Sequence, residues 1–490
     1  MSRLAVPFFL QTLLAGVLAV FAFAPFGLFP LAVLSLLLLF RVWLRCERPA
    51  QAAWSGFAFG MGLFSFGVGW IYVALHDYGY MHPVLAVIAT LLFAAFISLP
   101  LALAGGLQAR WRIAPAARVL LVMPAAWVLA EWVRGWMFTG FPWLVFGYAQ
   151  TPPSPLAGYA PLFGVYGVSL AVAASAGLLL FLMLRRRRAA LAALLAIWLA
   201  GAQLQHVEWT QPQGEPLKVA LLQGNIPQEE KFSQEMLVAT LETYRRLAQG
   251  SDARFIVMPE TALPLLRHNV PTHYQELLSE HVRQNGGDIL IGAFEKKEGR
   301  YYNSVYTLGS APSQHYRKDH LVPFGEFIPL RGVFGWLINE VLDIPMGDLA
   351  RGGAHQPPMA VAGQQVAVNI CYEDAFGEEI IRALPQATLL VNVTNDAWYG
   401  ESHAADQHNQ MAQMRALEAG RMMLRATNTG VTSVIGVDGS ILDALPQHAE
   451  GVLTAEVHGF AGSTPYARWG NAAMLLLLAV MLALAWRWRG

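Results

Sequence analysis

Acidic residues are nearly absent from the first 200 positions of this chain. Of its 33 Asp and Glu residues, only Glu47, Asp77 and Glu131 lie there, and all the others follow from Glu208 onwards. Charged residues make up 13% of the sequence and hydrophobic residues 55%, whereas about 25% charged residues is typical of soluble domains. This deficit excludes a wholly water-soluble globule and predicts a membrane part followed by a water-soluble part.

Cysteine is also scarce, with only Cys46 and Cys371 in 490 residues. Two thiols exclude a disulfide framework, and the topology inferred below places them on opposite sides of a membrane. Glycine-rich loops of the kind that bind nucleotide phosphates are missing too. The formal net charge is zero, so the charge balance gives no indication of a nucleic-acid partner.

Long uncharged runs predict eight membrane-spanning helices. A bilayer core needs about 20 apolar residues, so the charge-free stretch from Leu4 to Phe40 is too long for one crossing. Pro25, Gly27 and Pro30 interrupt it, and we expect two helices joined by a tight turn. The segments expected to span are 4–23, 29–44, 54–75, 83–105, 119–134, 163–184, 189–205 and 471–486.

Arginines mark alternate loops of this arrangement. Because basic residues accumulate on the cytoplasmic side, both termini are expected in the cytoplasm, and topology also explains the run Arg185 to Arg188 without nucleic acid. We therefore expect a membrane domain of seven spans at 1–205, an external domain at 206–468, and an eighth span with a cytoplasmic tail at 469–490. In a bacterium with two membranes, the chain would lie in the inner membrane with a periplasmic external domain. The marker arginines are Arg3, Arg41, Arg45, Arg48, Arg110, Arg112, Arg118, Arg185, Arg186, Arg187, Arg188, Arg487 and Arg489.

The external domain alternates short strand-like runs with longer amphipathic segments, which predicts an α/β layered fold. Methionines on the segment 404–425 form an apolar stripe, which we interpret as core rather than as a lipid-contacting surface. Helices are expected at 228–248, 272–285, 377–384 and 404–425. Strands are expected at 218–223, 254–258, 288–294, 366–370, 388–393, 431–437 and 452–457.

Three polar residues of this domain, Cys371, Glu260 and Lys318, lie near the ends of strand-like runs. A thiol attacks acyl groups, a carboxylate accepts the thiol proton, and an ammonium stabilises the oxyanion, so together they predict an acyl-transfer site. The alternatives are an inert buried cysteine, a surface glutamate, and a lysine paired with Asp319 or Glu326.

Four short motifs resemble the nitrilase superfamily. They are Pro259–Ala262, Tyr316–Lys318, Asn369–Glu373 and the pair Arg415–Glu418 with Asn428–Gly430. The resemblance implies an αββα sandwich with a Glu-Lys-Cys triad. The apolar segments, together with 138–148 and 391–400, extend it over the whole chain to the apolipoprotein N-acyltransferase family, a multi-span membrane domain joined to such a sandwich.

The resemblance implies a transfer in two steps. Cys371 would be the nucleophile that accepts an acyl chain from a phospholipid as a thioester. The acceptor would be the α-amino group of the N-terminal diacylglyceryl-cysteine of an apolipoprotein. Glu260 would act as the general base, and Lys318 with the backbone N–H of Tyr372 would stabilise the oxyanion. No cofactor is implied, and we expect a monomer.

Further residues are expected to support the site. Glu326 and Glu373 match polar positions of the family and would orient Lys318 or relay the amine proton. In the uncharged segment 138–148, aromatic residues would guide the acyl chain or serve as plain interfacial anchors. The residues assigned to this segment are Gly140, Phe141, Trp143 and Tyr148. The apolar loop with Phe324, Phe327, Phe334 and Trp336 is expected to be a lid or ordinary core.

Three other readings are weaker. His403, Asp406 and His408 fit no standard zinc spacing, and the triad needs no metal. A membrane-tethered amidase or nitrilase acting on a small amide would share the triad but would not need several membrane spans. A transporter would place ionisable residues inside its spans, where only Glu131 and Arg134 are found.

Overall fold

The computed structural model describes residues 5–185, 187–231, 233–329 and 348–487. The chain divides into two compact units. The helical unit comprises residues 1–72, 82–208 and 468–490, and the catalytic unit comprises 73–81 and 209–467. Several residues used above lie outside the described ranges, namely Arg3, Arg186, Phe334, Trp336 and Arg489.

Each of the eight apolar segments contains a helix in the helical unit, but the expected count of eight spans is not confirmed by the lengths of the described helices. By length and composition, three described helices could cross a membrane, or four if one bent pair counts as a single span. The three are Pro83–Arg110, Pro115–Arg134 and Pro155–Arg185. The helices of this unit are α1 (Ala5–Val20), α2 (Pro30–Arg45), α3 (Pro49–Gly67), α5 (Pro83–Arg110), α6 (Pro115–Ala117), α7 (Met123–Arg134), α8 (Ala160–Arg185), α9 (Arg188–Leu204) and α16 (Ala472–Trp486).

The segment expected to span from 54 to 75 is not one straight helix. Helix α3 ends at Gly67, and the chain turns by 59° before continuing over Ile71–Tyr78, which includes α4 (Ile71–Val73). Small residues explain why α3 packs closely on both neighbours. A Cβ atom at Gly62 would clash with the backbone of α1, and one at Gly56 with the backbone of α5. Helices that approach this closely leave room for no larger side chain.

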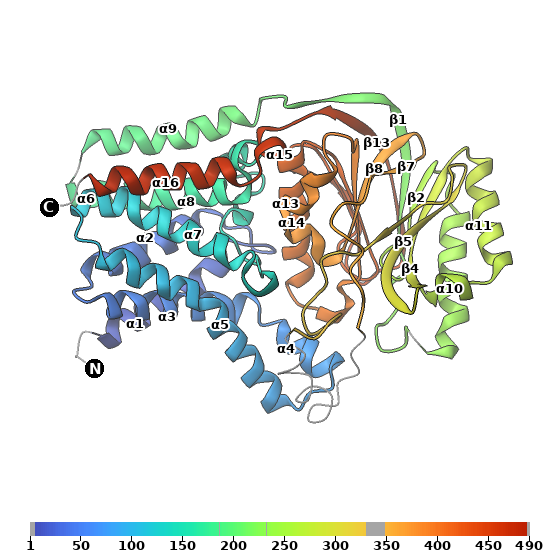
Figure 1. Cartoon of the computed structure of the whole chain (residues 1–490), viewed down its shortest axis with the longest axis horizontal. Coiled ribbons are helices and arrows are strands. Elements are labelled where there is room, and N and C mark those ends of the chain that lie inside the picture. The colour runs from blue at the N-terminus through green and yellow to red at the C-terminus, as the bar shows by residue number, and fades with distance from the viewer. Residues whose placement is uncertain (1–4, 186, 232, 330–347, 488–490) are drawn as a thin grey trace. The chain divides into compact units, whose positions relative to one another are not determined.

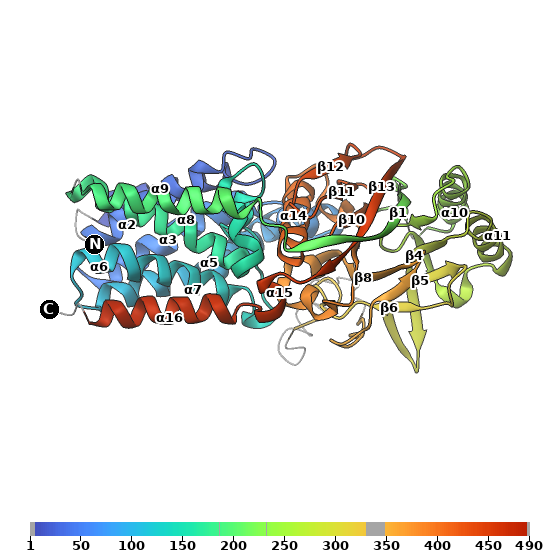
Figure 2. The same cartoon turned by 90° about the horizontal axis from the view of Figure 1, so that it is seen from above.

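Two β-sheets form the centre of the catalytic unit. Within the described residues the first has the order β13-β1-β2-β4-β5-β6, with β3 also paired to β4, and the second has the order β12-β11-β10-β9-β8-β7. The pairs β1–β2, β2–β4, β8–β9 and β9–β10 are parallel. Figure 2 shows the two long strands β1 and β13 side by side, in antiparallel register over most of their length.

The strands are β1 (Thr210–Gln223), β2 (Phe255–Val257), β3 (Leu263–Leu266), β4 (Asp288–Lys297), β5 (Arg300–Gly309), β6 (His315–Arg317), β7 (Met359–Val361), β8 (Gln364–Ile370), β9 (Leu389–Thr394), β10 (Met423–Thr427), β11 (Ser433–Ile435), β12 (Ile441–Ala444) and β13 (Gly451–Gly462).

Helices cover the outer faces of the two sheets. In Figure 1, α10 (Gln234–Gln249) and α11 (Thr272–Gln284) lie outside the first sheet, and α13 (Gly377–Ile380) and α14 (Ala404–Ala419) lie on the side of the second. Buried residues of β1, β2 and β4 form one core with α10 and α11, and β8, β9 and β10 form another with α14. This is the αββα sandwich that the sequence motifs implied.

Two expectations for this unit were wrong. The helix expected at 404–425 ends at Ala419, because Gly420 adopts a left-handed conformation with φ of 61° and Met423–Thr427 then enter the second sheet as β10. The helix expected from 228 begins only at Gln234, where the Ser233 side chain accepts a hydrogen bond from the N–H of Met236. Residues 228–231 therefore form a turn, in which Gln228 and Lys231 are buried.

Candidate active site

Cys371 occupies a strained position directly after strand β8. Its φ is +52°, a left-handed conformation that costs a non-glycine residue about 1 kcal/mol and that often marks functional sites. A 3₁₀ turn over Cys371–Ala375 begins here, and the Glu373 side chain accepts a hydrogen bond from the N–H of Ile370 at 2.7 Å. The turn takes the thiol off the line of the strand and leaves it buried at the strand end.

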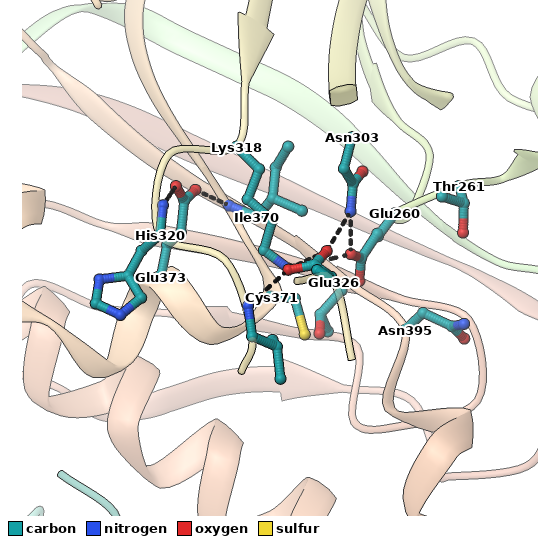
Figure 3. Close-up of polar contacts among 12 residues, drawn as sticks. Glu260, Thr261, Asn303, Lys318, His320, Glu326, Ile370, Cys371, Glu373 and Asn395 are labelled. Atoms are coloured by element: carbon teal, nitrogen blue, oxygen red, sulfur yellow. Dashed lines mark hydrogen bonds and ion pairs between the residues drawn. The ribbon is translucent and has the colours of Figure 1, made fainter. Parts of the chain in front are cut away.

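Glu260 and Lys318 approach this thiol from the first sheet. Glu260 comes three residues after β2, and its Oε1 lies 3.6 Å from the Nζ atom of Lys318. Lys318 directly follows β6 and is buried. In Figure 3 the side chains of Glu260, Lys318 and Cys371 converge. The three residues predicted from the sequence are therefore brought together from both sheets.

Glu326 completes the surroundings of the Lys318 ammonium. Its Oε1 lies 2.9 Å from Nζ, and its Oε2 accepts a hydrogen bond from the N–H of Val322 at 2.8 Å. Burial alone lowers the pKa of Lys318, but the carboxylates of Glu326 and Glu260 outweigh burial and raise the pKa above its ordinary value. The ammonium is therefore charged over the physiological pH range. Asp319 pairs with Arg351 instead.

The carboxylate of Glu373 binds backbone N–H groups and does not bind the Lys318 ammonium. Its carboxylate accepts hydrogen bonds from the N–H groups of Asp319 and His320, in addition to that of Ile370, and from the hydroxyl of Tyr316. Burial raises the pKa of Glu373 to about 7 against the opposing effect of these N–H groups. Its contacts tie the segment after Lys318 to the strand that carries Cys371.

The thiol of Cys371 is neutral in the resting site. Burial and then the negative charge of Glu260 raise its pKa well above the ordinary value, and Lys318 and Thr394 only partly offset them. A thiol in such a site needs a base at the moment of attack, because the thiolate is the nucleophile. The carboxylate of Glu260, whose charge acts on this thiol, is the candidate for that base.

Sequence reasoning missed two residues next to Glu260. Asn303 of β5 donates to Glu260 Oε1 at 2.7 Å and to Glu326 Oε1 at 3.2 Å, so it fixes both carboxylates. Lys231, in the turn before α10, donates to the hydroxyl of Thr261 at 2.7 Å and to the Glu260 carbonyl at 3.4 Å. Burial lowers the pKa of Lys231 to about 8, although Glu260 opposes this. Neither residue lies in a local sequence motif that would have indicated a place in the site.

The segment 138–148 belongs to the helical unit, where most of its aromatic side chains face inward. Trp143 and Tyr148 are each 1% exposed, and the Trp143 ring packs 5.0 Å from that of Trp70. Arg134 donates to the Trp143 carbonyl at 2.6 Å, and Glu131 accepts from the N–H of Phe146 at 2.8 Å. The two ionisable residues of this apolar region therefore fix the loop.

Two aromatic residues of the same region, Phe138 and Phe141, are more exposed than Trp143 and Tyr148. Phe141 is half-buried and stacks on Trp143, while Gly140 has a φ of 87° that favours glycine. Phe138, which the sequence analysis did not single out, is 67% exposed. The exposed aromatic surface of the segment thus lies before Gly140.

No group of three or more potential ligands able to hold a metal is found among the described residues. His408 instead lies between two carboxylates, with Nδ1 2.8 Å from Asp396 and Nε2 2.8 Å from Asp374. Arg425 contacts the same two residues at 2.9 and 3.0 Å. Histidine and arginine supply the positive charge that balances these two buried carboxylates. Asp406 is elsewhere, bound to Gln447.

Comparisons with known proteins cover both parts of the chain. Residues 15–178 match the apolipoprotein N-acyltransferase N-terminal domain, and residues 218–466 match the carbon-nitrogen hydrolase family. The apolipoprotein N-acyltransferase of Nitrosomonas europaea is 51% identical over 470 residues, which cover 95% of this chain and 94% of that protein. That of Methylococcus capsulatus is 45% identical, over 94% of this chain and 92% of its own length.

Proposed function

The chain belongs to the apolipoprotein N-acyltransferase family, and we propose that it transfers an acyl chain from a phospholipid to the N-terminal diacylglyceryl-cysteine of apolipoproteins. The convergence of Cys371, Glu260 and Lys318 in one buried site carries this proposal. A thiol, a base and a fixed cation are what transfer through a covalent thioester requires. The match to relatives over nearly the whole length supports the choice of substrates.

In the first step, Glu260 takes the proton of the Cys371 thiol as the thiolate attacks the ester carbonyl of the phospholipid. The carbonyl oxygen becomes an oxyanion beside the Lys318 ammonium and the N–H of Tyr372. When the intermediate collapses, the bond to the glycerol oxygen breaks, and that oxygen receives the proton from Glu260. A lysophospholipid leaves, and the acyl chain remains on sulfur.

In the second step, the α-amino group of the apolipoprotein attacks the thioester. Glu260 takes a proton from the nitrogen, and the same cation and N–H group stabilise the second oxyanion. The carbon–sulfur bond breaks, the sulfur regains a proton from Glu260, and an amide is formed. Glu326 keeps the Lys318 ammonium in place through both steps, and Glu373 maintains the backbone around the nucleophile.

We also propose that the eight apolar segments cross the inner membrane of a bacterium with two membranes, with the catalytic unit in the periplasm. The arginines on alternate loops support this orientation. Within the segment 138–148, Phe141 is the candidate for guiding the acyl chain. The burial of Trp143 and Tyr148 favours a packing role for these two residues.

A trapped intermediate tests the proposal. Purified enzyme mixed with phospholipid alone, without lipoprotein, should gain the mass of one acyl chain on Cys371, and hydroxylamine should remove it. Cys371→Ser should lose nearly all transfer, because an alcohol is a far weaker nucleophile at its free pKa. Cys46→Ala is the matched control and should load normally. Near-normal transfer by Cys371→Ser would refute the assignment, and release of ammonia from small amides instead would favour the amidase.

A further inference from the structure

The carbonyl group of Cys371 points into a buried polar cluster. It accepts a hydrogen bond from Asn392 Nδ2 at 3.2 Å and lies 3.3 Å from the Nε2 atom of His408. Asn392 is on β9 and His408 on α14, so two different elements hold the same oxygen atom. Both side chains are buried.

The geometry requires the imidazole of His408 to be doubly protonated. Each ring nitrogen lies 2.8 Å from a carboxylate oxygen, of Asp396 on one side and of Asp374 on the other, and a carboxylate only accepts hydrogen bonds. Burial and Arg425 lower the pKa of His408, but Asp374 and Asp396 outweigh them and raise it to about 9. Two carboxylates, one imidazolium and one guanidinium make the cluster neutral as a whole.

Holding this carbonyl also sets the direction of the next N–H group. The carbonyl of Cys371 and the N–H of Tyr372 belong to one planar peptide, and in a trans peptide the two groups point in opposite directions. A carbonyl fixed toward the cluster therefore aims the N–H away from it and prevents the peptide from rotating. A positive charge on the carbonyl side also polarises the peptide and makes its N–H a stronger donor.

We propose that His408 and Asn392 are positioning residues that fix and polarise the Cys371–Tyr372 peptide, so that the N–H of Tyr372 serves as an oxyanion donor. The inference rests on the proposed thioester chemistry and adds to it. It also accounts for the left-handed φ of Cys371, which the two contacts on its carbonyl stabilise. Asp374, Asp396 and Arg425 keep His408 charged and oriented.

Two reactions of the Cys371 thiol can distinguish the proposed positioning role of His408 from a purely structural role. Acylation by phospholipid passes through an oxyanion, whereas alkylation by iodoacetamide forms none. In full-length His408→Gln enzyme carrying Cys46→Ala, single-turnover acylation of Cys371 should fall by about 10²-fold, the usual cost of losing an oxyanion donor. The limiting rate of Cys371 alkylation at high pH, where the thiol is ionised in both enzymes, should stay close to that of the parent, because any effect of the lost charge on the thiol pKa is absent there. Aminolysis of a preformed thioester should slow as much as acylation.

A second variant protects the test against misfolding. Asp374→Asn combined with His408→Gln removes one charge of each sign, keeps the cluster neutral, and should show the same selective loss. Asn409→Ala is the matched control, because Asn409 is the next residue of α14, is equally buried, and contacts Ser433 rather than the site. Both of its rates should equal those of the parent.

Two results would overturn the inference. A parallel fall in acylation and alkylation would reduce the cluster to a structural support, and unchanged acylation would remove it from the mechanism. Either result leaves Cys371→Ser inactive, whereas an active Cys371→Ser enzyme would refute the proposed function itself.

Discussion

At the scale of single residues, the site keeps the proposed nucleophile uncharged and the nearby proposed oxyanion-stabilising cation charged. The Cys371 thiol is kept protonated by burial and by the carboxylate of Glu260, while Lys318 stays charged nearby. A permanent thiolate would pair with the ammonium and compete with the oxyanion for it. In the proposed reaction, Glu260 would therefore form the thiolate during the attack on the substrate.

This balance predicts opposite effects of one substitution on two reactions. Glu260→Gln removes the base, so phospholipid acylation should be lost. It also removes a negative charge beside the thiolate, so the pKa of Cys371 should fall. The measurement is the pH dependence of Cys371 alkylation by iodoacetamide in a Cys46→Ala background, whose midpoint should move to lower pH.

Glu280→Gln provides the comparison, because Glu280 lies in α11 and its side chain is exposed. Its alkylation profile should match that of the parent. A midpoint that stays in place or rises in Glu260→Gln would mean that the carboxylate does not act electrostatically on the thiol.

At the scale of elements, Gly420 ends α14 and allows the chain to enter strand β10, which carries Arg425. Gly420 has a φ of 61°, and a Cβ atom there would lie 2.7 Å from the Thr210 side chain. Gly420→Ala should therefore combine a backbone cost of about 1 kcal/mol with steric overlap that costs about 1–3 kcal/mol more. The expected result is a lower thermal unfolding midpoint than that of the wild type.

The control for this substitution is Gly286→Ala. Gly286 has a similar φ of 66° after α11, but a Cβ atom would meet nothing within 4 Å. It should show the backbone cost alone, so its midpoint should fall between those of the wild type and Gly420→Ala. Equal midpoints for the two variants would show that the Thr210 contact adapts without cost.

The same element shows what local sequence patterns can and cannot predict. The apolar spacing of α14 runs past Gly420 into β10, and the periodicity alone gave one helix to residue 425. The strand is distinguished by pairing with β9, a partner more than 30 residues away. Glu260 and Cys371 could be singled out because each follows a hydrophobic run, and Lys318 because of the Tyr316–Lys318 motif. Asn303 and Lys231 could not, since each reaches Glu260 only through the tertiary fold.

At the scale of the whole molecule, apolar composition located the long helices well, because an uncharged run of that length has few alternatives. It did not show that residues 73–81 leave the helical unit and pack with the catalytic unit. There the Tyr78 ring meets that of Trp398 edge-on at 6.1 Å, and Trp398 belongs to the turn that carries Asp396. The catalytic unit is thus built from two separate stretches of chain.

Joining both units in one chain predicts a dependence on how the substrate is presented. Moving an acyl chain from a bilayer into water costs about 0.8 kcal/mol per CH₂, so exposing ten methylenes costs about 8 kcal/mol. A catalytic domain held at the membrane avoids most of this cost, whereas a free one does not. Residues 206–468 expressed alone should therefore transfer little from phospholipid vesicles, yet should still accept acyl groups from a short-chain, water-soluble ester.

The comparison is made between this fragment and the full chain, with both donors. The alkylation rate of Cys371 serves as the check that the fragment is folded. A large loss with vesicles and a small loss with the soluble ester would support a tethering role for the helices. Equal losses with both donors, in a fragment that alkylates normally, would contradict it. Such a result would point instead to the missing segment 73–81, whose contact with the turn at Trp398 would then be needed for turnover with any donor.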